Sequence, residues 1–145
     1  MESALEYMAR KHVTLINDYR TPCGNYSESC GIIAIELAER LLSEGKEPYI
    51  MKVAEDVFSS GFITCKVLKP LTYEGRIRWG AHQVCCWDGK VYDPILDKPV
   101  SLKDYFKLVF GEEVEISVLI PSNEINEYIS RGKSWKKKKD KLHSQ

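Results

Sequence analysis

The sequence predicts a single α+β domain whose N-terminal helices pack on a mainly antiparallel sheet. The first 45 residues carry helical periodicity, and short runs of β-forming residues follow them. Two of those runs flank Asp88-Gly89, and such a dipeptide is the strongest short-range signal for a β-hairpin. Helices that precede mostly antiparallel strands are typical of an α+β layout.

Two helices are expected in the first 45 residues. Apolar residues spaced along residues 2–20 predict the first, and residues 21–25 (TPCGN) end it, because proline and glycine both break helices. The second helix is expected to begin near residues 27–29, where either of two serines can cap it, and to end at Gly45. This start places Cys30 in the first helical turn, on the buried stripe.

The later elements are shorter. Strands are expected at residues 49–53, 62–68, 81–87, 91–95 and 114–120, with a loop or bent connection over residues 70–79. Short helices are expected from Ser101 to Gly111 and over residues 122–130. We therefore expect one domain over residues 1–132 and a basic, flexible tail over residues 133–145.

Composition excludes several classes of function. The chain has 145 residues, and its 21 Lys and Arg balance its 21 Asp and Glu, so no overall field favours nucleic acid or a membrane. Residues 133–145 hold six lysines and one aspartate, which leaves residues 1–132 mildly acidic. Only Trp135 accompanies the lysine run, a poor pattern for a nucleic-acid interface.

The cysteines and the N-terminus indicate the compartment. No apolar segment is long enough for a membrane span, and residues 1–10 do not resemble a secretory signal. The five cysteines show no disulfide-framework spacing, which suits a reducing environment. We expect a cytoplasmic protein, or an effector exported without a cleavable signal peptide.

Cys30 is the candidate nucleophile. A thiol attacks effectively only as a thiolate, and the N-terminal turn of a helix lowers the thiol pKa. The backbone N–H groups of that turn can also hold a developing oxyanion. Asn25, expected in the preceding loop, could add a side-chain donor. Trp79 and Gly80 lead into His82 and are candidates for the substrate-binding cleft.

His82 and Asp93 are the candidate partners of Cys30. If Asp88-Gly89 forms a two-residue turn, Val84 faces Asp93 and His82 faces Ile95. His82 and Asp93 then share one face as diagonal neighbours, roughly 7–8 Å apart at the backbone. An acid at that position can orient the imidazole and stabilise its protonated form, as a Cys-His-Asp triad requires.

These residues resemble the papain-fold and transglutaminase-like superfamily of cysteine hydrolases. The phrase HQVCCWDGKVYDP (His82–Pro94) is similar to that group's His-to-Asp hairpin, and the order Cys30, His82, Asp93 in a short chain is most similar to compact bacterial papain-fold toxin domains. The resemblance spans residues 25–97. It implies thiol chemistry on a protein or peptide amide: deamidation of glutamine, transglutamination or peptide hydrolysis. Papain-like peptidases place a glutamine ahead of the cysteine for the oxyanion, and none precedes Cys30.

Other interpretations stay open. Each of the three residues alone is more often structural, and a non-catalytic protein-interaction domain on the same scaffold is the main alternative. The chain has no C-x-x-C or H-E-x-x-H motif, so no metal is expected, and a zinc site from Cys65, His82 and Cys86 is a minor alternative. We expect no organic cofactor. The sequence does not choose among the amide chemistries and does not indicate an oligomeric state.

Overall fold

The computed structural model describes residues 2–18, 25–53, 63–67, 78–79, 82–114 and 116–133. Its helices are α1 (Ala4–Asp18), α2 (Asn25–Ser43) and α4 (Leu102–Phe110), and a 3-10 turn η1 (Ser122–Glu124) continues into a helix over residues 125–133. The strands are β1 (Tyr49–Val53), β2 (Ile63–Thr64), β3 (Arg78–Trp79), β4 (His82–Trp87), β5 (Lys90–Tyr92), β6 (Val100–Ser101) and β7 (Ile116–Ile120).

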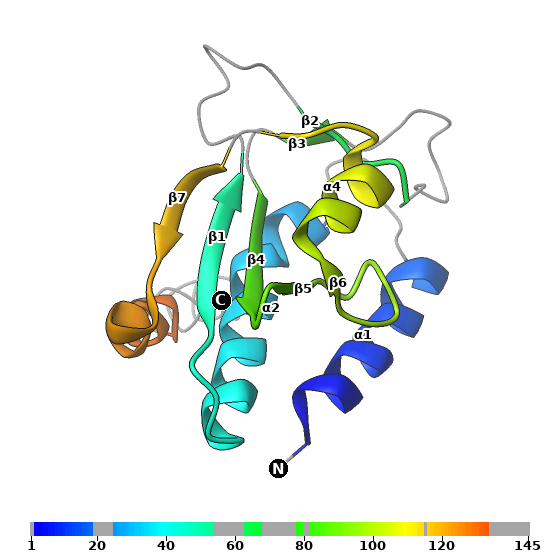
Figure 1. The fold of residues 1–145 in the computed structure, drawn as a ribbon. Coiled ribbons are helices and arrows are strands. Elements are labelled where there is room, and N and C mark those ends of the chain that lie inside the picture. Colours follow the sequence, from blue (N-terminus) through cyan, green and yellow to red (C-terminus); the bar gives the residue numbers. More distant parts are fainter. Residues whose placement is uncertain are drawn as a thin grey trace, which may run out of the picture.

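Five of the strands form one antiparallel sheet in the order β6-β5-β4-β1-β7, and β2 pairs with β3 separately. Helix α2 packs along β4 and β1 and lies behind them in Figure 1, while α1 packs on α2. Helix α4 packs against β5 and β6. The predicted α+β layout, with N-terminal helices on an antiparallel sheet, is confirmed.

The β4–β5 hairpin has the predicted turn. Asp88 and Gly89 both have positive φ angles, 53° and 73°, as the mirror-image hairpin turn requires. Lys90 therefore pairs with Trp87, and the ladder continues through Cys86↔Val91 and Cys85↔Tyr92. It ends there, so the expected return strand to residue 95 is too long. The backbone turns at residues 94–95 instead, where Leu96 N–H donates to the carbonyl of Asp93.

Three other elements differ from the sequence prediction. Helix α2 begins at Asn25, earlier than expected, so Asn25 is helical and not in a loop. Of the expected strand over residues 62–68, the structure describes residues 63–67, and within these only Ile63–Thr64 forms strand β2. Of the expected loop over residues 70–79, it describes Arg78–Trp79, which forms strand β3 because Trp79 pairs with Ile63. The final helix extends to residue 133. The rest of the expected basic tail, residues 134–145, lies outside the described residues.

Helix α4 forms as the sequence predicts. The Ser101 side chain accepts a hydrogen bond from the backbone N–H of Asp104, and Gly111 ends the helix in the left-handed conformation at φ 79°. Its inner face buries Tyr105, Phe106, Val109 and Phe110 against the strands. This face becomes one wall of the site described below.

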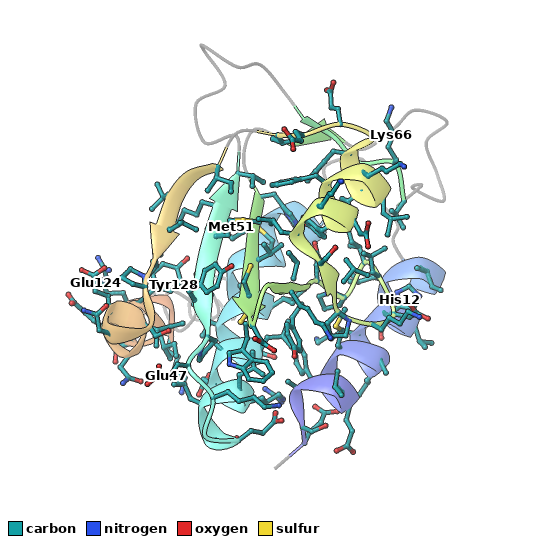
Figure 2. The ribbon with its side chains drawn as sticks, in the orientation of Figure 1. His12, Glu47, Met51, Lys66, Glu124 and Tyr128 are labelled. Atoms are coloured by element: carbon teal, nitrogen blue, oxygen red, sulfur yellow. The ribbon has the colours of Figure 1, made fainter. Side chains whose placement is uncertain are left out.

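Two hydrogen bonds position the elements around the sheet. His12 of α1, which is labelled in Figure 2, donates from Nδ1 to the carbonyl of Pro94 at 2.9 Å and so fixes the segment that follows Asp93. Ser122 donates to the carbonyl of Pro48 at 2.6 Å and thereby ties the start of the final helix to the entry of β1. In the part of the chain that the structure describes, no helix is both long and apolar enough to cross a membrane.

Candidate functional site

A buried His-Asp pair lies where β4 and β5 separate. The Nε2 atom of His82, the first residue of β4, is 2.9 Å from Oδ2 of Asp93, the first residue after β5. Both side chains are almost fully buried, with 0% and 1% of their surface exposed. A buried carboxylate that accepts a hydrogen bond from imidazole fixes which ring nitrogen carries the proton.

The Asp93 carboxylate is held from two further directions. The hydroxyl of Tyr105, on α4, donates to Oδ2 at 2.6 Å, and the backbone N–H of Ile95 donates to Oδ1 at 3.2 Å. Phe110, five residues further along α4, makes an edge-to-face contact with His82, with the ring centres 6.4 Å apart. Helix α4 thus supplies the wall that keeps water from the pair. No pattern in the sequence indicated these roles of Tyr105 and Phe110.

Cys30 reaches the pair from α2. The imidazole of His82 and the backbone N–H of Gln83 lie beside the Cys30 sulfur, and both lower the pKa of its thiol. The pairing of β4 with β5 ends at Cys85↔Tyr92. Gln83 therefore belongs to the part of β4 that has no partner residue on β5. Because Nε2 of His82 is bound to Asp93, Nδ1 is the nitrogen available to the sulfur. The structure therefore brings the side chains of Cys30, His82 and Asp93 together.

The position of Cys30 in its helix differs from the prediction. Helix α2 begins at Asn25, so Cys30 lies in the second turn. Its own N–H is used within the helix, because each helical N–H donates to the carbonyl four residues earlier. The free N–H groups of the helix N-terminus therefore do not surround the sulfur, and the expected activation by the first turn is wrong.

The partners of Cys30 replace that activation. Burial by itself raises the pKa of the Cys30 thiol, but the hydrogen bonds from His82 and from Gln83 N–H, with the charge of His82, bring that pKa below its usual value. Burial likewise lowers the pKa of His82, but the Asp93 carboxylate and the bond to Cys30 raise it to about 9. Both pKa shifts act in the direction of a thiolate on Cys30 and an imidazolium on His82.

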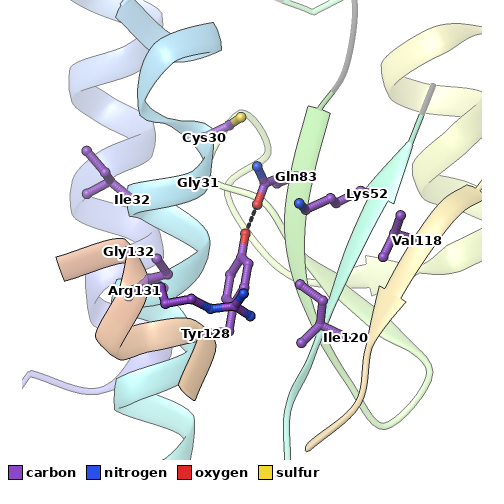
Figure 3. A pocket seen from close by; sticks show the side chains of 11 residues that line it. Cys30, Gly31, Ile32, Lys52, Gln83, Val118, Ile120, Tyr128, Arg131 and Gly132 are labelled. Carbon is purple, nitrogen blue, oxygen red and sulfur yellow. Dashed lines mark hydrogen bonds between the residues drawn. The ribbon is translucent and has the colours of Figure 1, made fainter. Parts of the chain in front are cut away.

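Two residues at the site were not anticipated. The hydroxyl of Tyr128, in the helix over residues 125–133, donates to the amide oxygen of Gln83 (Figure 3). The Nε2 atom of Gln83 lies against Gly31, 3.5 Å from where a Cβ on that glycine would be. A polar residue beside His82 on a strand was the only signal in the sequence, and nothing there predicted that Tyr128 would orient it.

A pocket of about 540 Å³ opens beside the sulfur. It lies between α2, the final helix and strands β4, β1 and β7, and Cys30 and Gln83 line its upper end in Figure 3. Its size is in the range of pockets that hold small ligands or part of a chain. Gly132 lets the final helix contact Ile35 of α2, so the pocket is closed on that side.

The other predicted site residues are less well placed. Asn25 is the first residue of α2, five positions before Cys30, and the expected oxyanion role of its side chain is untested. Trp79 pairs with Ile63 in β3, and Gly80 lies outside the described residues. Among the described residues, no three His, Cys, Asp or Glu side chains cluster in a way that could hold a metal ion.

Comparison with known proteins adds no relative. No protein-family model matches the chain, and neither the curated proteins nor the solved structures contain a significant match.

Proposed function

We propose that this protein is a thiol-dependent hydrolase or acyl transferase that acts on an amide bond of a protein or peptide, with a papain-like or transglutaminase-like architecture. The observation that carries the proposal is that Cys30 lies beside His82, which is hydrogen-bonded to Asp93, at the edge of a pocket. A helix-borne cysteine against a strand histidine, which an acid orients, is the arrangement that nucleophilic thiol catalysis needs.

The proposed reaction has two steps. The thiolate of Cys30 attacks the amide carbonyl carbon, and the imidazolium of His82 gives its proton to the amine, which leaves as the C–N bond breaks. His82 then accepts a proton from water or from a second amine, which attacks the thioester and releases the acyl group and the thiolate. Deamidation, peptide hydrolysis and transglutamination differ only in which amine leaves and which nucleophile enters.

Gln83 is the proposed donor to the oxyanion. Tyr128 binds the amide oxygen of Gln83, which leaves the Nε2 hydrogens free to point toward the residue that follows Cys30. A donor near the attacked carbonyl stabilises the negative charge that its oxygen gains. Papain-like peptidases use a glutamine ahead of the cysteine, so this chain would supply the same group from the strand that carries the histidine.

Selective alkylation tests the proposed nucleophile. Iodoacetamide at pH 7 is expected to modify Cys30 about tenfold or more faster than Cys65, Cys85 or Cys86, because alkylation requires the thiolate. Burial raises the pKa values of the Cys85 and Cys86 thiols, that of Cys86 to about 12. The rates are measured by peptide mass spectrometry in a Cys23→Ser background, since Cys23 lies outside the described residues.

The His82→Ala variant is the control for this experiment. Without the imidazole, the pKa of the Cys30 thiol is expected to rise, and labelling at pH 7 is expected to slow to the rate of the other buried cysteines. The non-catalytic alternative, in which the same residues only pack the core, predicts uniformly slow labelling in both proteins. Fast labelling of Cys30 that does not depend on His82 would also contradict the proposal.

Gln83→Ala provides a separate test of the oxyanion donor. It is expected to lower kcat for hydrolysis of an activated ester by about 10²–10³-fold, because one preorganised donor is lost. Tyr128→Phe, which keeps Gln83 but frees its amide, is expected to have a smaller effect. Neither change should slow alkylation by iodoacetamide, which forms no oxyanion. A loss of labelling together with kcat would indicate a structural role for Gln83.

A further inference from the structure

The pocket beside Cys30 has apolar walls and two cationic side chains. Ile35 of α2, Val118 and Ile120 of β7 supply much of the wall. Lys52 reaches into the pocket from β1 and Arg131 from the final helix (Figure 3). Among the described residues that line the pocket, these two are the charged ones, and both are positive. Apolar walls lower the local dielectric constant and strengthen the attraction of such groups for an anion.

The register between β1 and β4 places Lys52 close to the proposed reacting atoms. It pairs directly with Gln83 across β1 and β4, and the backbone N–H of Gln83 lies beside the sulfur of Cys30. Directly paired residues have Cβ atoms about 5 Å apart. The Lys52 ammonium also lies 5.7 Å from the centre of the Tyr128 ring, whose hydroxyl binds Gln83. Lys52 is thus the direct cross-strand neighbour of Gln83, which lies beside the proposed nucleophile.

Two carboxylates of α2 line a different cavity. Glu36 and Glu39 of α2 line a smaller cavity of about 100 Å³ on the other side of the contact between Ile35 and Gly132. Glu39 is paired there with Lys133 at 2.6 Å. These two acids therefore line the smaller cavity and not the pocket beside Cys30. The positive charge is local, because residues 1–132 as a whole are mildly acidic.

We propose that this pocket binds a carboxylate of the substrate, so that the preferred amide lies next to an acidic residue or next to the C-terminus of a peptide. The proposal rests on the proposed thiol chemistry of Cys30 and adds the class of substrate to it. Two cations of different reach, Lys52 from the sheet and Arg131 from the helix, flank the position that this carboxylate occupies.

Three bromoacetyl probes test the preference without a known substrate. In each, the Cys30 thiolate displaces bromide and forms a C–S bond. Bromoacetyl-glutamine amide is neutral, bromoacetyl-glutamate amide carries a side-chain carboxylate, and bromoacetyl-glutamine carries a terminal carboxylate. At least one acidic probe is expected to alkylate Cys30 about tenfold faster than the neutral probe, the effect of one charge-assisted hydrogen bond. The faster acidic probe identifies the source of the carboxylate.

Substitution of the cations tests their assignment. Lys52→Gln and Arg131→Gln are each expected to reduce the advantage of the acidic probe about threefold or more, and the double variant is expected to abolish it. In each variant the rate of the acidic probe is divided by the rate of the neutral probe, so that any general effect of the substitution on the reactivity of Cys30 cancels. Lys103→Gln is the matched control, because it removes the same charge from the exposed side of α4, outside the pocket, and should leave all three rates as they are.

Equal rates for the three probes would overturn the carboxylate proposal while leaving the thiol chemistry in place. A preference for the acidic probes that persists in the double variant would also overturn the carboxylate proposal, because that preference would then not come from Lys52 and Arg131. If no probe modifies Cys30 faster than the other buried cysteines, both this proposal and the proposed function fail.

Discussion

Alanine in place of Cys30 is expected to abolish turnover and leave the fold intact. The sulfur is the proposed attacking atom, and no neighbouring group can replace it, because His82 and Asp93 serve only to activate and orient it. Hydrolysis of p-nitrophenyl acetate is expected to fall by about a thousandfold or more, toward the rate in the absence of protein. Loss of one small buried side chain should cost about 1 kcal/mol of unfolding free energy.

Cys65→Ala is the matched control for this experiment. Cys65 is also buried and lacks a disulfide, and it does not line the pocket beside Cys30. The two variants should lose similar stability in urea unfolding, but only Cys30→Ala should lose activity. Turnover that persists in Cys30→Ala, or that falls equally in both variants, would show that the thiol of Cys30 is not the nucleophile.

Asn in place of Asp93 is expected to have the second largest effect, a loss of about 10⁴-fold in kcat with a smaller change in KM. The Asp93 carboxylate accepts hydrogen bonds from His82, Tyr105 and the N–H of Ile95, and the amide of Asn can satisfy only part of this set. Without the negative charge, the pKa of His82 is expected to fall, and the thiolate of Cys30 then loses its imidazolium partner.

The same substitution should change how stability depends on pH. The pKa of His82 is raised from 6.5 to about 9, so the protonated ring contributes stability fully below pH 6.5 and loses it as the pH rises through 9. A shift of this size corresponds to at most about 3 kcal/mol. Deprotonation of Cys30, whose pKa is lowered, acts in the opposite direction, so the measurement needs a Cys30→Ala background.

In that background, urea unfolding is expected to show lower stability at pH 10 than at pH 6, and the addition of Asp93→Asn should remove most of the difference. Tyr105→Phe is the control, because it deletes one hydrogen bond to Asp93 and keeps the carboxylate charge. It should retain the pH dependence and lose about tenfold in kcat. Wild-type kcat in Asp93→Asn would contradict the assigned role of the acid.

Local sequence signals predicted the hairpin and helix α4. Asp88-Gly89 adopts the positive φ angles that few other residue pairs tolerate, and this choice fixes Trp87 opposite Lys90. Ser101 and Gly111 likewise define both ends of α4 by their own backbone and side-chain chemistry. Features of this kind depend on neighbours within a few residues, so the sequence alone contains them.

The start of α2 was less predictable. The two serines of residues 27–29 are good capping residues, but the helix begins at Asn25, which can also act as a cap. Propensity does not distinguish among several adjacent capping residues. Because the helix begins earlier than expected, Cys30 lies in its second turn and not its first. The pKa of Cys30 is therefore lowered by His82 and Gln83 and not by the helix N-terminus.

The sequence by itself determined the α+β class, the hairpin register and the order of the three candidate side chains along the chain. Only the tertiary structure decided what surrounds them: Tyr105 and Phe110 from α4, Tyr128 on Gln83, and the pocket with Lys52 and Arg131. The physical reason is distance along the chain. The hydrogen bonds among those contacts join residues 12 to 45 positions apart, and the packing of whole elements, which no local pattern encodes, brings them together.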